Sequence, residues 1–268
     1  MVNLSVSIIT VSYNSIGTIS ATINSVLSQT YPNIEYIIID GSSIDGTIEL
    51  VNSFGKSISK FVSEPDNGIY DAINKGIRLA TGNIVGILNS DDFFSDEYII
   101  EKIAGAFKGN EIDAVFGDVK FVDPIKTSKI VRYYSSKFFN VNKFKFGFMP
   151  AHPSFYAKRE LFKKLGYYKT NYKIAGDFEL LIRFLYNYQI KYKYIEMPFV
   201  SMRTGGVSNK SIRNVYTLNK EIARACKENE IKTNFIYIYS KYFIKLFEFF
   251  GNKVTHKNDS KSWLHIRL

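Results

Sequence analysis

The chain has 268 residues, of which 46% are hydrophobic and 22% charged, a balance that excludes a disordered or fibrous protein. Its single cysteine, Cys226, excludes an internal disulfide and a zinc site made of several thiolates, and no apolar run reaches the ~20 residues that span a bilayer. Residues 1–100 hold 4 basic and 11 acidic residues, whereas residues 101–268 hold 31 and 14, so a net charge of +10 combines an acidic front half with a basic back half. This suits a metal ion bound by the front half and an anionic partner of the back half, although solubility also explains part of it.

The first 120 residues alternate short β-branched runs with segments of helical spacing, which is typical of a parallel α/β sheet. The runs predicted as strands are 4–11, 34–39, 58–63, 83–89 and 113–117. The segments predicted as helices are about 16–27, 45–54, 69–80 and 96–108. The predicted fold class is therefore α/β, with a mostly parallel sheet flanked by helices.

The alternation weakens after Val122. A further strand is predicted at 190–196, and helices are predicted at 158–165, 176–188, 208–229 and 234–250. The helix at 208–229 is basic, and the one at 234–250 is aromatic and amphipathic.

Polar residues follow three predicted strands, at 10–14, 40–47 and 89–92. In an open parallel sheet, ligands bind beyond the carboxyl ends of the strands. The first strand is followed by neither G-x-G-x-x-G nor a Walker A sequence, which weighs against a dehydrogenase and a P-loop enzyme. Asp40 is placed to bind a ribose or a base, but Asp-Gly-Ser-Ser is also a common turn.

Asp91 and Asp92 directly follow an apolar strand. Adjacent carboxylates repel each other unless a cation or hydrogen-bond donors compensate them. Mg²⁺ typically takes one or two carboxylates and completes its shell with water and phosphate oxygens, an arrangement suited to a diphosphate leaving group. A solvated loop, or a cap for the next helix, is the alternative.

The segments SIITVSYNS, IDGSSIDGT, EPDNGIYDAINKGIRLATG and GILNSDD resemble, in order and spacing, the family 2 glycosyltransferases, which have the GT-A fold. The resemblance covers roughly residues 3–205, and it is strongest to bacterial enzymes that build capsule, O-antigen or exopolysaccharide. It implies a catalytic domain over 1–205, with a nucleotide and metal half at about 1–122 and an acceptor half at about 123–205. Basic and amphipathic helices at 206–250 and a flexible tail at 251–268 are expected to follow.

The resemblance assigns Thr10, Tyr13 and Asp40 to the nucleotide base and ribose. Asp66 matches a position lining the same pocket, although turn chemistry explains it equally well. Lys75 and Arg78, on the following helix, are expected to approach the phosphates or to form a solvated helix face.

In the family's metal motif, the second acidic residue, here Asp92, coordinates Mn²⁺ or Mg²⁺, and the first, Asp91, contacts the ribose or sugar. Arg203 lies in a stretch that resembles a donor-closing loop and is expected to neutralise phosphate charge, with a plain glycine hinge as the alternative. His152 lies at the expected acceptor entrance. It is predicted to contact the metal, the diphosphate or the acceptor, or else to stabilise a turn between prolines.

Asp177 matches the family's catalytic base, while Gly176 departs from the glutamate usual before it. An inverting displacement needs one carboxylate to take the proton of the acceptor hydroxyl, whereas a retaining double displacement needs a second, nucleophilic one. A helix cap with a core face behind it is the structural alternative for Asp177, and both roles are compatible.

Residues 132–148 place seven aromatic residues among four cations, a composition that suits bases, sugars or a lipid interface. The helix at 234–250 either packs on the domain or lies on the membrane surface. The leading hypothesis is an inverting, metal-dependent enzyme that transfers a sugar, most simply from a UDP-sugar, to a glycan or polyprenyl-diphosphate-linked acceptor. We expect it in the cytoplasm or at the inner face of the cytoplasmic membrane. The alternatives are a catalytically silent partner in a polysaccharide assembly complex, which Gly176 favours, and a nucleic-acid-binding module.

Overall fold

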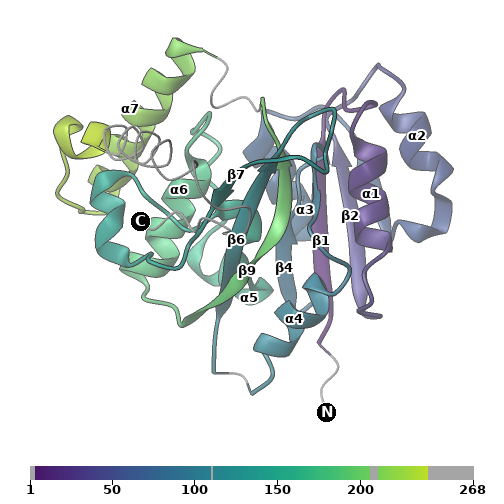
Figure 1. Ribbon diagram of the computed structural model, residues 1–268, viewed down its shortest axis with the longest axis horizontal. Helices are drawn as coiled ribbons and strands as arrows, with labels where there is room; N and C mark the ends of the chain where they lie inside the picture. Colours follow the sequence, from purple (N-terminus) through teal and green to yellow (C-terminus); the bar gives the residue numbers. More distant parts are fainter. Residues whose placement is uncertain (1–3, 110, 206–210, 241–268) are drawn as a thin grey trace, which may run out of the picture.

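The computed structural model describes residues 4–109, 111–205 and 211–240, and its centre is a mixed β-sheet (Figure 1). In this part of the chain nine strands join in the order β3-β2-β1-β4-β8-β6-β9-β5, with β7 paired to β6. The strands are β1 (Val6–Ser12), β2 (Ile34–Asp40), β3 (Lys60–Ser63), β4 (Ile84–Ile87), β5 (Asp92–Phe94), β6 (Ala114–Val122), β7 (Ile130–Tyr134), β8 (Tyr156–Lys158) and β9 (Tyr192–Arg203). The pairs among β1 to β4 are parallel, whereas β8 runs antiparallel to β4 and β6. The predicted α/β class is confirmed.

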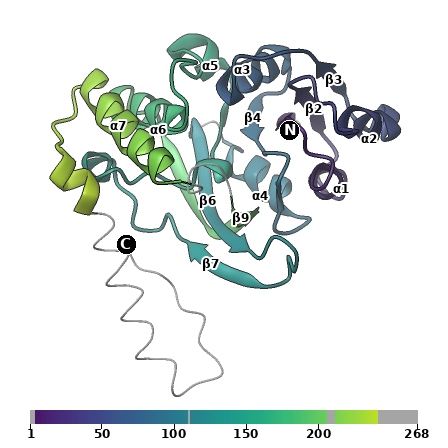
Figure 2. The same cartoon turned by 90° about the horizontal axis from the view of Figure 1, so that it is seen from above.

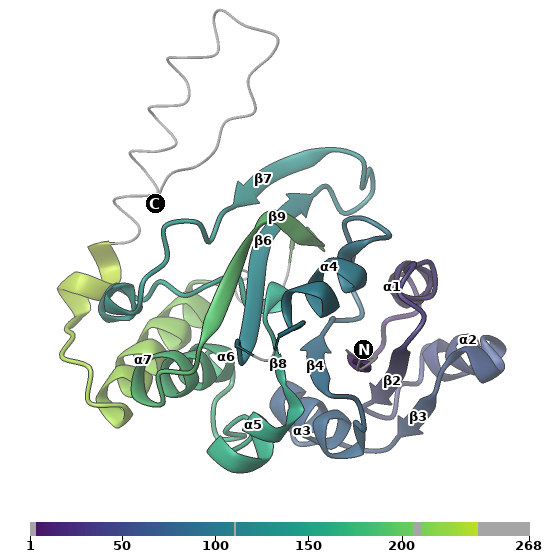
Figure 3. The same ribbon diagram turned by 90° about the horizontal axis from the view of Figure 1, so that it is seen from below.

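Helices cover both faces of this sheet (Figures 2 and 3). They are α1 (Ile19–Leu27), α2 (Thr47–Ser53), α3 (Ile69–Leu79), α4 (Ile99–Ala106), α5 (Arg159–Leu165), α6 (Gly176–Leu181) and α7 (Ile212–Glu228). Buried side chains of α3, α5, α6 and α7 join one hydrophobic cluster, and those of α1, α2 and α4 join another. Two covered faces explain why the inner strands read as continuous apolar runs.

The two clusters take alternate residues of each inner strand. In β1, Ile8 belongs to one cluster and Ile9 to the other, because successive side chains of a strand point to opposite faces. Helix α3 lies close to the sheet at Gly76, where a Cβ would be only 2.4 Å from Cγ2 of Ile9. A larger residue at Gly76 would push α3, and the loop in front of it, away from the strands.

Three short strands, β5, β7 and β8, were not predicted. β5 and β8 pair antiparallel with strands distant in the sequence, so their own residues carry little periodicity, whereas β7 pairs with the preceding strand β6. The helix predicted at 176–188 divides into α6 and a π-helical turn at Ile182–Asn187. The strand predicted at 190–196 continues to Arg203 because β6 runs beside it along this length.

Helix α7 lies within the predicted basic helix and buries Ile222, Ala225 and Cys226 in the same cluster as α3 and α6. The predicted boundary at residue 205 stays a prediction, but α7 shares its core with the preceding domain. Of the predicted aromatic helix, residues 235–240 are helical, and residues 241–250 lie outside the described part, as does the predicted tail at 251–268. Each helix of the described residues is too short or too polar to cross a bilayer.

Glu35 connects three strands, and its ionisation is expected to control stability in acid. Its carboxylate accepts hydrogen bonds from Ser7 Oγ (2.6 Å), Lys60 Nζ (2.7 Å) and Thr81 N (2.7 Å). Burial alone would raise its pKa, but the hydrogen bonds from Lys60, Ser7 and Thr81 together outweigh burial and lower the pKa from 4.5 to about 2. Because the folded-state pKa lies below the unfolded one, this stabilisation is complete above about pH 5 and is lost as the pH falls toward about 2.

We expect the free energy of unfolding, measured by urea denaturation, to lose about 1–2 kcal/mol through this group over that range, after a discount for solvent screening. Glu35→Gln should lower stability at neutral pH and remove this part of the acid dependence. An acid limb as steep in the variant as in the wild type would contradict the assignment.

Candidate active site

The carboxyl ends of β1, β2 and β4 lie side by side at one edge of the sheet. β1 pairs in parallel with β2 on one side and with β4 on the other, and the register sets Ser12 beside Asp40. The polar runs that follow these strands therefore meet, as the sequence predicted. This edge is where an open α/β sheet binds its ligand.

Asp40 lies buried at the end of β2. Its Oδ1 accepts from the hydroxyls of Ser12 (3.0 Å) and Ser43 (2.5 Å). Its Oδ2 accepts from the backbone N–H of Ser43 and the hydroxyl of Ser63, each at 2.8 Å. Four donors of the chain itself thus use the acceptor capacity of the carboxylate. Asp40 holds the loop after β2 in place, and its contact with a nucleotide stays a prediction.

Thr10 is fully buried within β1, where its hydroxyl lies 3.1 Å from the hydroxyl of Tyr36. The predicted contact of Thr10 with a nucleotide stays a prediction. Its side chain is enclosed in the core, so it supports the strand from within and presents no surface at the sheet edge.

Tyr13 and Asp66, two further residues predicted to bind the nucleotide, approach each other across Gly41. Tyr13 is 64% exposed, and Asp66 lies in the turn before α3, where its Oδ1 accepts from the N–H of Gly68 at 2.8 Å. A Cβ on Gly41 would lie 2.5 Å from Oδ2 of Asp66 and 3.3 Å from Cδ2 of Tyr13. An exposed ring beside a carboxylate offers a stacking surface and a hydrogen-bond acceptor, which a base requires. The nucleotide role of the pair stays a prediction.

Replacement of Gly41 by alanine is expected to weaken nucleotide binding about tenfold, because the new methyl group would displace the carboxylate of Asp66. Titration calorimetry with UDP and Mn²⁺ measures this effect. Gly105→Ala is the matched control, since a Cβ there meets nothing within 4 Å. Equal UDP affinities in the Gly41 variant and the wild type would contradict the proposed role of Tyr13 and Asp66 in nucleotide binding.

The two cations predicted to approach phosphates are engaged within the chain. Lys75 Nζ donates to the carbonyl of Pro65 at 2.8 Å and pairs with Oε1 of Glu64 at 2.9 Å. The guanidinium of Arg78 lies over the ring of Tyr167, 4.9 Å from its centroid. Lys75 therefore braces the turn that carries Asp66, and its phosphate contact stays a prediction.

Asp92 begins β5 and is only 1% exposed. Burial, and then the charge of Asp91, raise the pKa of Asp92 well above its ordinary value, against the opposing effects of Asn89 and Arg203. The amide nitrogen of Asn89 lies 3.5 Å from Oδ2 of Asp92, and the buried amide oxygen of Asn89 has no partner among the described residues. The carboxyl group of Asp92 and the amide oxygen of Asn89 are therefore neighbouring oxygen donors, and a bound cation would supply the positive charge that both oxygens lack without it. Asn89, in the Asn-Ser-Asp-Asp run, is a candidate that the sequence analysis did not single out.

These oxygen donors fit Mg²⁺ or Mn²⁺. Within the described ranges, no group of three or more His, Cys, Asp or Glu side chains is arranged to hold a metal. The protein therefore offers one or two ligands from this group of residue types, and water and substrate oxygens would complete the shell, as is usual for Mg²⁺.

Arg203 reaches this motif from β9, since β5 pairs with β9 and sets Asp92 beside Met202. Its Nη1 donates to the carbonyl of Asp91 at 2.5 Å, and its guanidinium lies 5.1 Å from the centroid of the Phe93 ring. Arg203 therefore holds the acidic pair in place. Its predicted contact with phosphate stays a prediction.

Asp177, at the start of α6, is paired with His152. Nδ1 of His152 lies 3.4 Å from Oδ2 of Asp177, and Oδ1 of Asp177 accepts from the N–H of Phe178 at 2.8 Å. Both side chains are largely buried, and in the part of the chain that the structure describes Nε2 of His152 meets no hydrogen-bond partner. The geometry thus joins two residues that the sequence had placed in different roles, the base and a metal ligand.

Tyr70 of α3 explains why glycine occupies position 176. A Cβ on Gly176 would lie 2.7 Å from the ring of Tyr70. The Tyr70 hydroxyl accepts from the N–H of Gly176 at 2.9 Å and donates to the carbonyl of Ile174 at 2.6 Å. The departure from the family pattern therefore has a packing cause. Sequence analysis had assigned Tyr70 no function.

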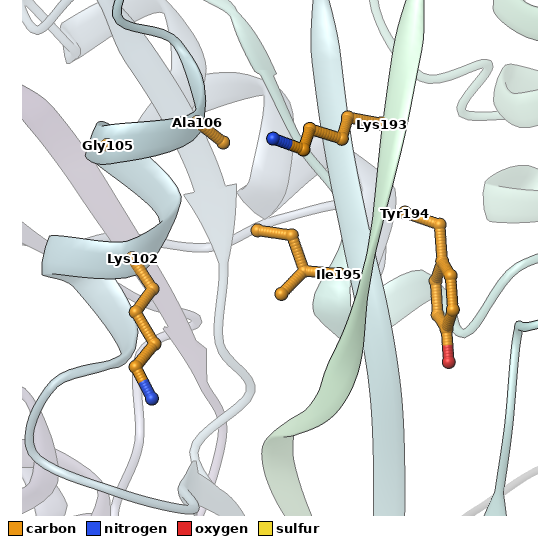
Figure 4. A pocket seen from close by; sticks show the side chains of 6 residues that line it. All are labelled: Lys102, Gly105, Ala106, Lys193, Tyr194 and Ile195. Atoms are coloured by element: carbon orange, nitrogen blue, oxygen red, sulfur yellow. The ribbon is translucent and has the colours of Figure 1, made fainter.

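A shallow hollow of about 360 Å³ lies between α4 and β9 and shares no residue with this site (Figure 4). Its lining residues are Lys102, Gly105, Ala106, Lys193, Tyr194 and Ile195. In Figure 4 the side chain of Lys193 extends toward α4, while the ring of Tyr194 lies on the opposite side of β9.

The chain is similar to two glycosyltransferases of known name. A PGL/p-HBAD biosynthesis glycosyltransferase of Mycobacterium bovis is 28% identical over 208 residues, 76% of this chain and 78% of that protein. The UDP-Glc:alpha-D-GlcNAc-diphosphoundecaprenol beta-1,3-glucosyltransferase WfaP of Escherichia coli is 38% identical over 114 residues, 41% of this chain and 43% of that protein.

Solved structures share the fold. S. aureus TarS in complex with UDP-GlcNAc matches 95% of this chain and 76% of its own, with a TM-score of 0.67 and 17% identity. The mannosyltransferase PcManGT of Pyrobaculum calidifontis, in complex with GDP-Man and Mn²⁺, matches 84% of this chain and 64% of its own, with a TM-score of 0.62 and 22% identity. The predicted GT-A-like architecture is confirmed. The model of glycosyl transferase family 2 matches residues 7–166, more than half of the chain, so this protein belongs to that family and is a glycosyltransferase.

Proposed function

We propose that this glycosyltransferase is inverting and metal-dependent, and that it transfers a sugar from a UDP-sugar to a glycan or a lipid-linked glycan during the synthesis of a bacterial surface polysaccharide. The observation that carries the proposal is the buried oxygen pair of Asp92 and Asn89 at the ligand-binding edge of the sheet. Support for a UDP-linked donor comes from TarS, which was crystallised with UDP-GlcNAc, and from WfaP, whose name specifies UDP-Glc. The name of WfaP also specifies a diphosphoundecaprenol-linked acceptor.

Asp92, together with Asn89, would hold Mn²⁺ or Mg²⁺, the former being the ion in the PcManGT structure. When bound, such an ion stabilises the negative charge of a departing diphosphate. Arg203 keeps Asp91 and Asp92 in position through the Asp91 carbonyl and contributes positive charge beside them. Tyr13 and Asp66 are proposed to bind the base on the neighbouring side.

Asp177 is proposed as the base that takes the proton of the acceptor hydroxyl. His152, 3.4 Å away, is proposed to fix the orientation of its carboxylate. One base is sufficient for a single displacement with inversion, and the proposal requires no nucleophilic carboxylate. The earlier prediction that His152 binds the metal is retained as the alternative, because its Nε2 has no partner in the described structure.

Contact with a membrane surface is proposed for the helical residues 235–240. Phe235 and Ile236 are 54% and 79% exposed, whereas Ile238 is buried and Tyr237 packs against Phe146. The helix therefore rests on the domain with one side and presents apolar side chains with the other. Sedimentation with phosphatidylglycerol vesicles should be reduced by Phe235→Ser with Ile236→Ser, and equal sedimentation of the two proteins would reject the contact.

Three of the seven aromatic residues of 132–148 are engaged within the domain, which weakens the support for nucleic-acid binding. Phe144 is fully buried, Tyr133 donates to Asp118 and Tyr134 donates to the carbonyl of Met149. These side chains stabilise the domain itself and are not free to stack on bases. The basic surface alone would give sequence-independent, salt-sensitive binding.

A thermal-shift panel tests the proposal. We expect UDP or a UDP-sugar to raise the melting temperature in the presence of Mn²⁺, and EDTA to abolish the increase. ADP and GDP serve as comparisons for the base. If none of the nucleoside diphosphates stabilised the protein with Mn²⁺, the proposed donor site would be wrong.

A further inference from the structure

Three consecutive backbone amides in front of the proposed base point at one carboxylate of α7. Oε1 of Glu221 accepts from the N–H of Lys173 at 2.8 Å, and Oε2 accepts from those of Ile174 and Ala175, each at 2.9 Å. Gly176 and Asp177 follow directly. Glu221 is 9% exposed, and a carboxylate so enclosed is retained only where donors compensate its charge.

The opposite side of the same loop is held by Tyr70, whose hydroxyl bonds to the carbonyl of Ile174 and the N–H of Gly176. Two side chains from separate helices, α7 and α3, thus bind the amides of residues 173–176 in succession. α7 packs directly against α6, the helix that Asp177 begins (Figure 2). Little freedom is left in the backbone that leads into Asp177.

The attachment of α7 to the domain does not depend on this carboxylate alone. Ile222, Ala225 and Cys226 of α7 are buried in the main hydrophobic cluster. Glu228, a second acid on α7, is partly exposed and binds three side chains, those of Lys169 (2.9 Å), Arg224 (2.6 Å) and Tyr172 (3.0 Å). Glu228 therefore contacts side chains, whereas Glu221 binds the backbone amides that lead into the base.

We propose that Glu221 is a positioning residue for catalysis, and that α7 belongs to the active site by setting the place of Asp177 through the 173–175 amides. This inference rests on the proposed role of Asp177 as the base. Misplacement of a reacting group by about 1 Å can cost ~100-fold in rate. A less ordered loop before Asp177 is therefore expected to lower kcat.

The test compares Glu221→Gln with Glu228→Gln, an identical change on the same helix. A glutamine amide nitrogen cannot accept a hydrogen bond. In Glu221→Gln, at least one of the three backbone N–H groups would therefore face another donor in place of a carboxylate oxygen. Turnover is measured as UDP release, with Mn²⁺, from UDP-glucose or UDP-N-acetylglucosamine, whichever the wild type hydrolyses faster. We expect kcat to fall about 10- to 100-fold in Glu221→Gln, with KM for the donor and the affinity for UDP within about twofold of the wild type. Glu228→Gln should keep wild-type kcat.

Wild-type kcat in Glu221→Gln would overturn the inference, and so would a parallel loss of UDP affinity and kcat, which indicates a general structural role. If Glu221→Gln does not fold, Glu221→Asp carries the same comparison, because it keeps the charge and shortens the side chain. Asp177→Asn distinguishes a failure of the proposed base from a failure of the positioning role of Glu221. Full activity in that variant rejects the proposed base, whereas loss of activity there, combined with wild-type kcat in Glu221→Gln, rejects the positioning role alone.

Discussion

Replacement of Asp92 by asparagine is expected to reduce UDP release from a UDP-sugar by at least about 100-fold and to abolish the effect of Mn²⁺ on UDP affinity. Asparagine has the shape of the protonated acid, and burial together with Asp91 already raises the pKa of Asp92 well above its ordinary value. The metal-free variant should therefore fold normally, with a melting temperature equal to or above that of the wild type. Kinetics with Mn²⁺ and titration calorimetry with UDP measure the two effects.

Asp96→Asn is the matched control for this variant, since Asp96 lies four residues further along the chain on the surface. It should keep both activity and Mn²⁺-dependent UDP binding. Wild-type turnover in Asp92→Asn would reject the metal site, and with it the mechanism proposed for the donor diphosphate.

Replacement of Asp177 by asparagine is expected to lower kcat about 100- to 10,000-fold, the range typical for loss of a general base, and to leave UDP affinity unchanged. The reason is that its contacts are with His152 and the N–H of Phe178. Asparagine has a similar shape, and its single oxygen can keep the hydrogen bond from the N–H of Phe178 while its amide nitrogen takes the place of Oδ2 beside His152. Steady-state kinetics and calorimetry on the same preparation measure the separation of turnover from binding.

His152→Gln distinguishes the two roles proposed for the histidine. If His152 orients Asp177, kcat falls while Mn²⁺-dependent UDP affinity stays at the wild-type value. A fall in that affinity would instead assign His152 to the metal. For Asp177→Asn, simultaneous loss of UDP binding and turnover would contradict the base assignment and favour a structural role.

Much of the nucleotide half could be predicted from the sequence because its strands are local and buried on both faces. Ile34 to Ile39 is a nearly unbroken apolar run, and such a run predicts an interior parallel strand with helices on both faces. The same logic predicted that the polar ends of β1, β2 and β4 meet, and the sheet order confirms it. The family resemblance added roles for individual residues, which patterns alone do not supply.

The short strands β5 and β8 were less predictable because they pair with strands far along the chain. β5 is three residues long and exists through its pairing with β9, more than 100 residues later. That pairing brings Arg203 to the carbonyl of Asp91, a contact with no trace in the local sequence. For the same reason, the engagement of Thr10 with Tyr36, and of Asp40 with three serines, appears only when the elements pack.

The order of apolar runs and acidic turns in this chain was enough to indicate its fold class and the edge of the sheet that holds the candidate site, and the resemblance of its motifs indicated its family, since motifs, hydrophobic alternation and strand-end chemistry are properties of short segments. Contacts between side chains of distant segments are not properties of any short segment. Three such contacts join separate parts of the chain: His152 pairs with Asp177, the ring of Tyr70 packs against Gly176, and Glu221 accepts hydrogen bonds from the 173–175 amides. Hydrogen bonds and packing act over a few ångströms, so such partners are set by the folded arrangement and by no local pattern.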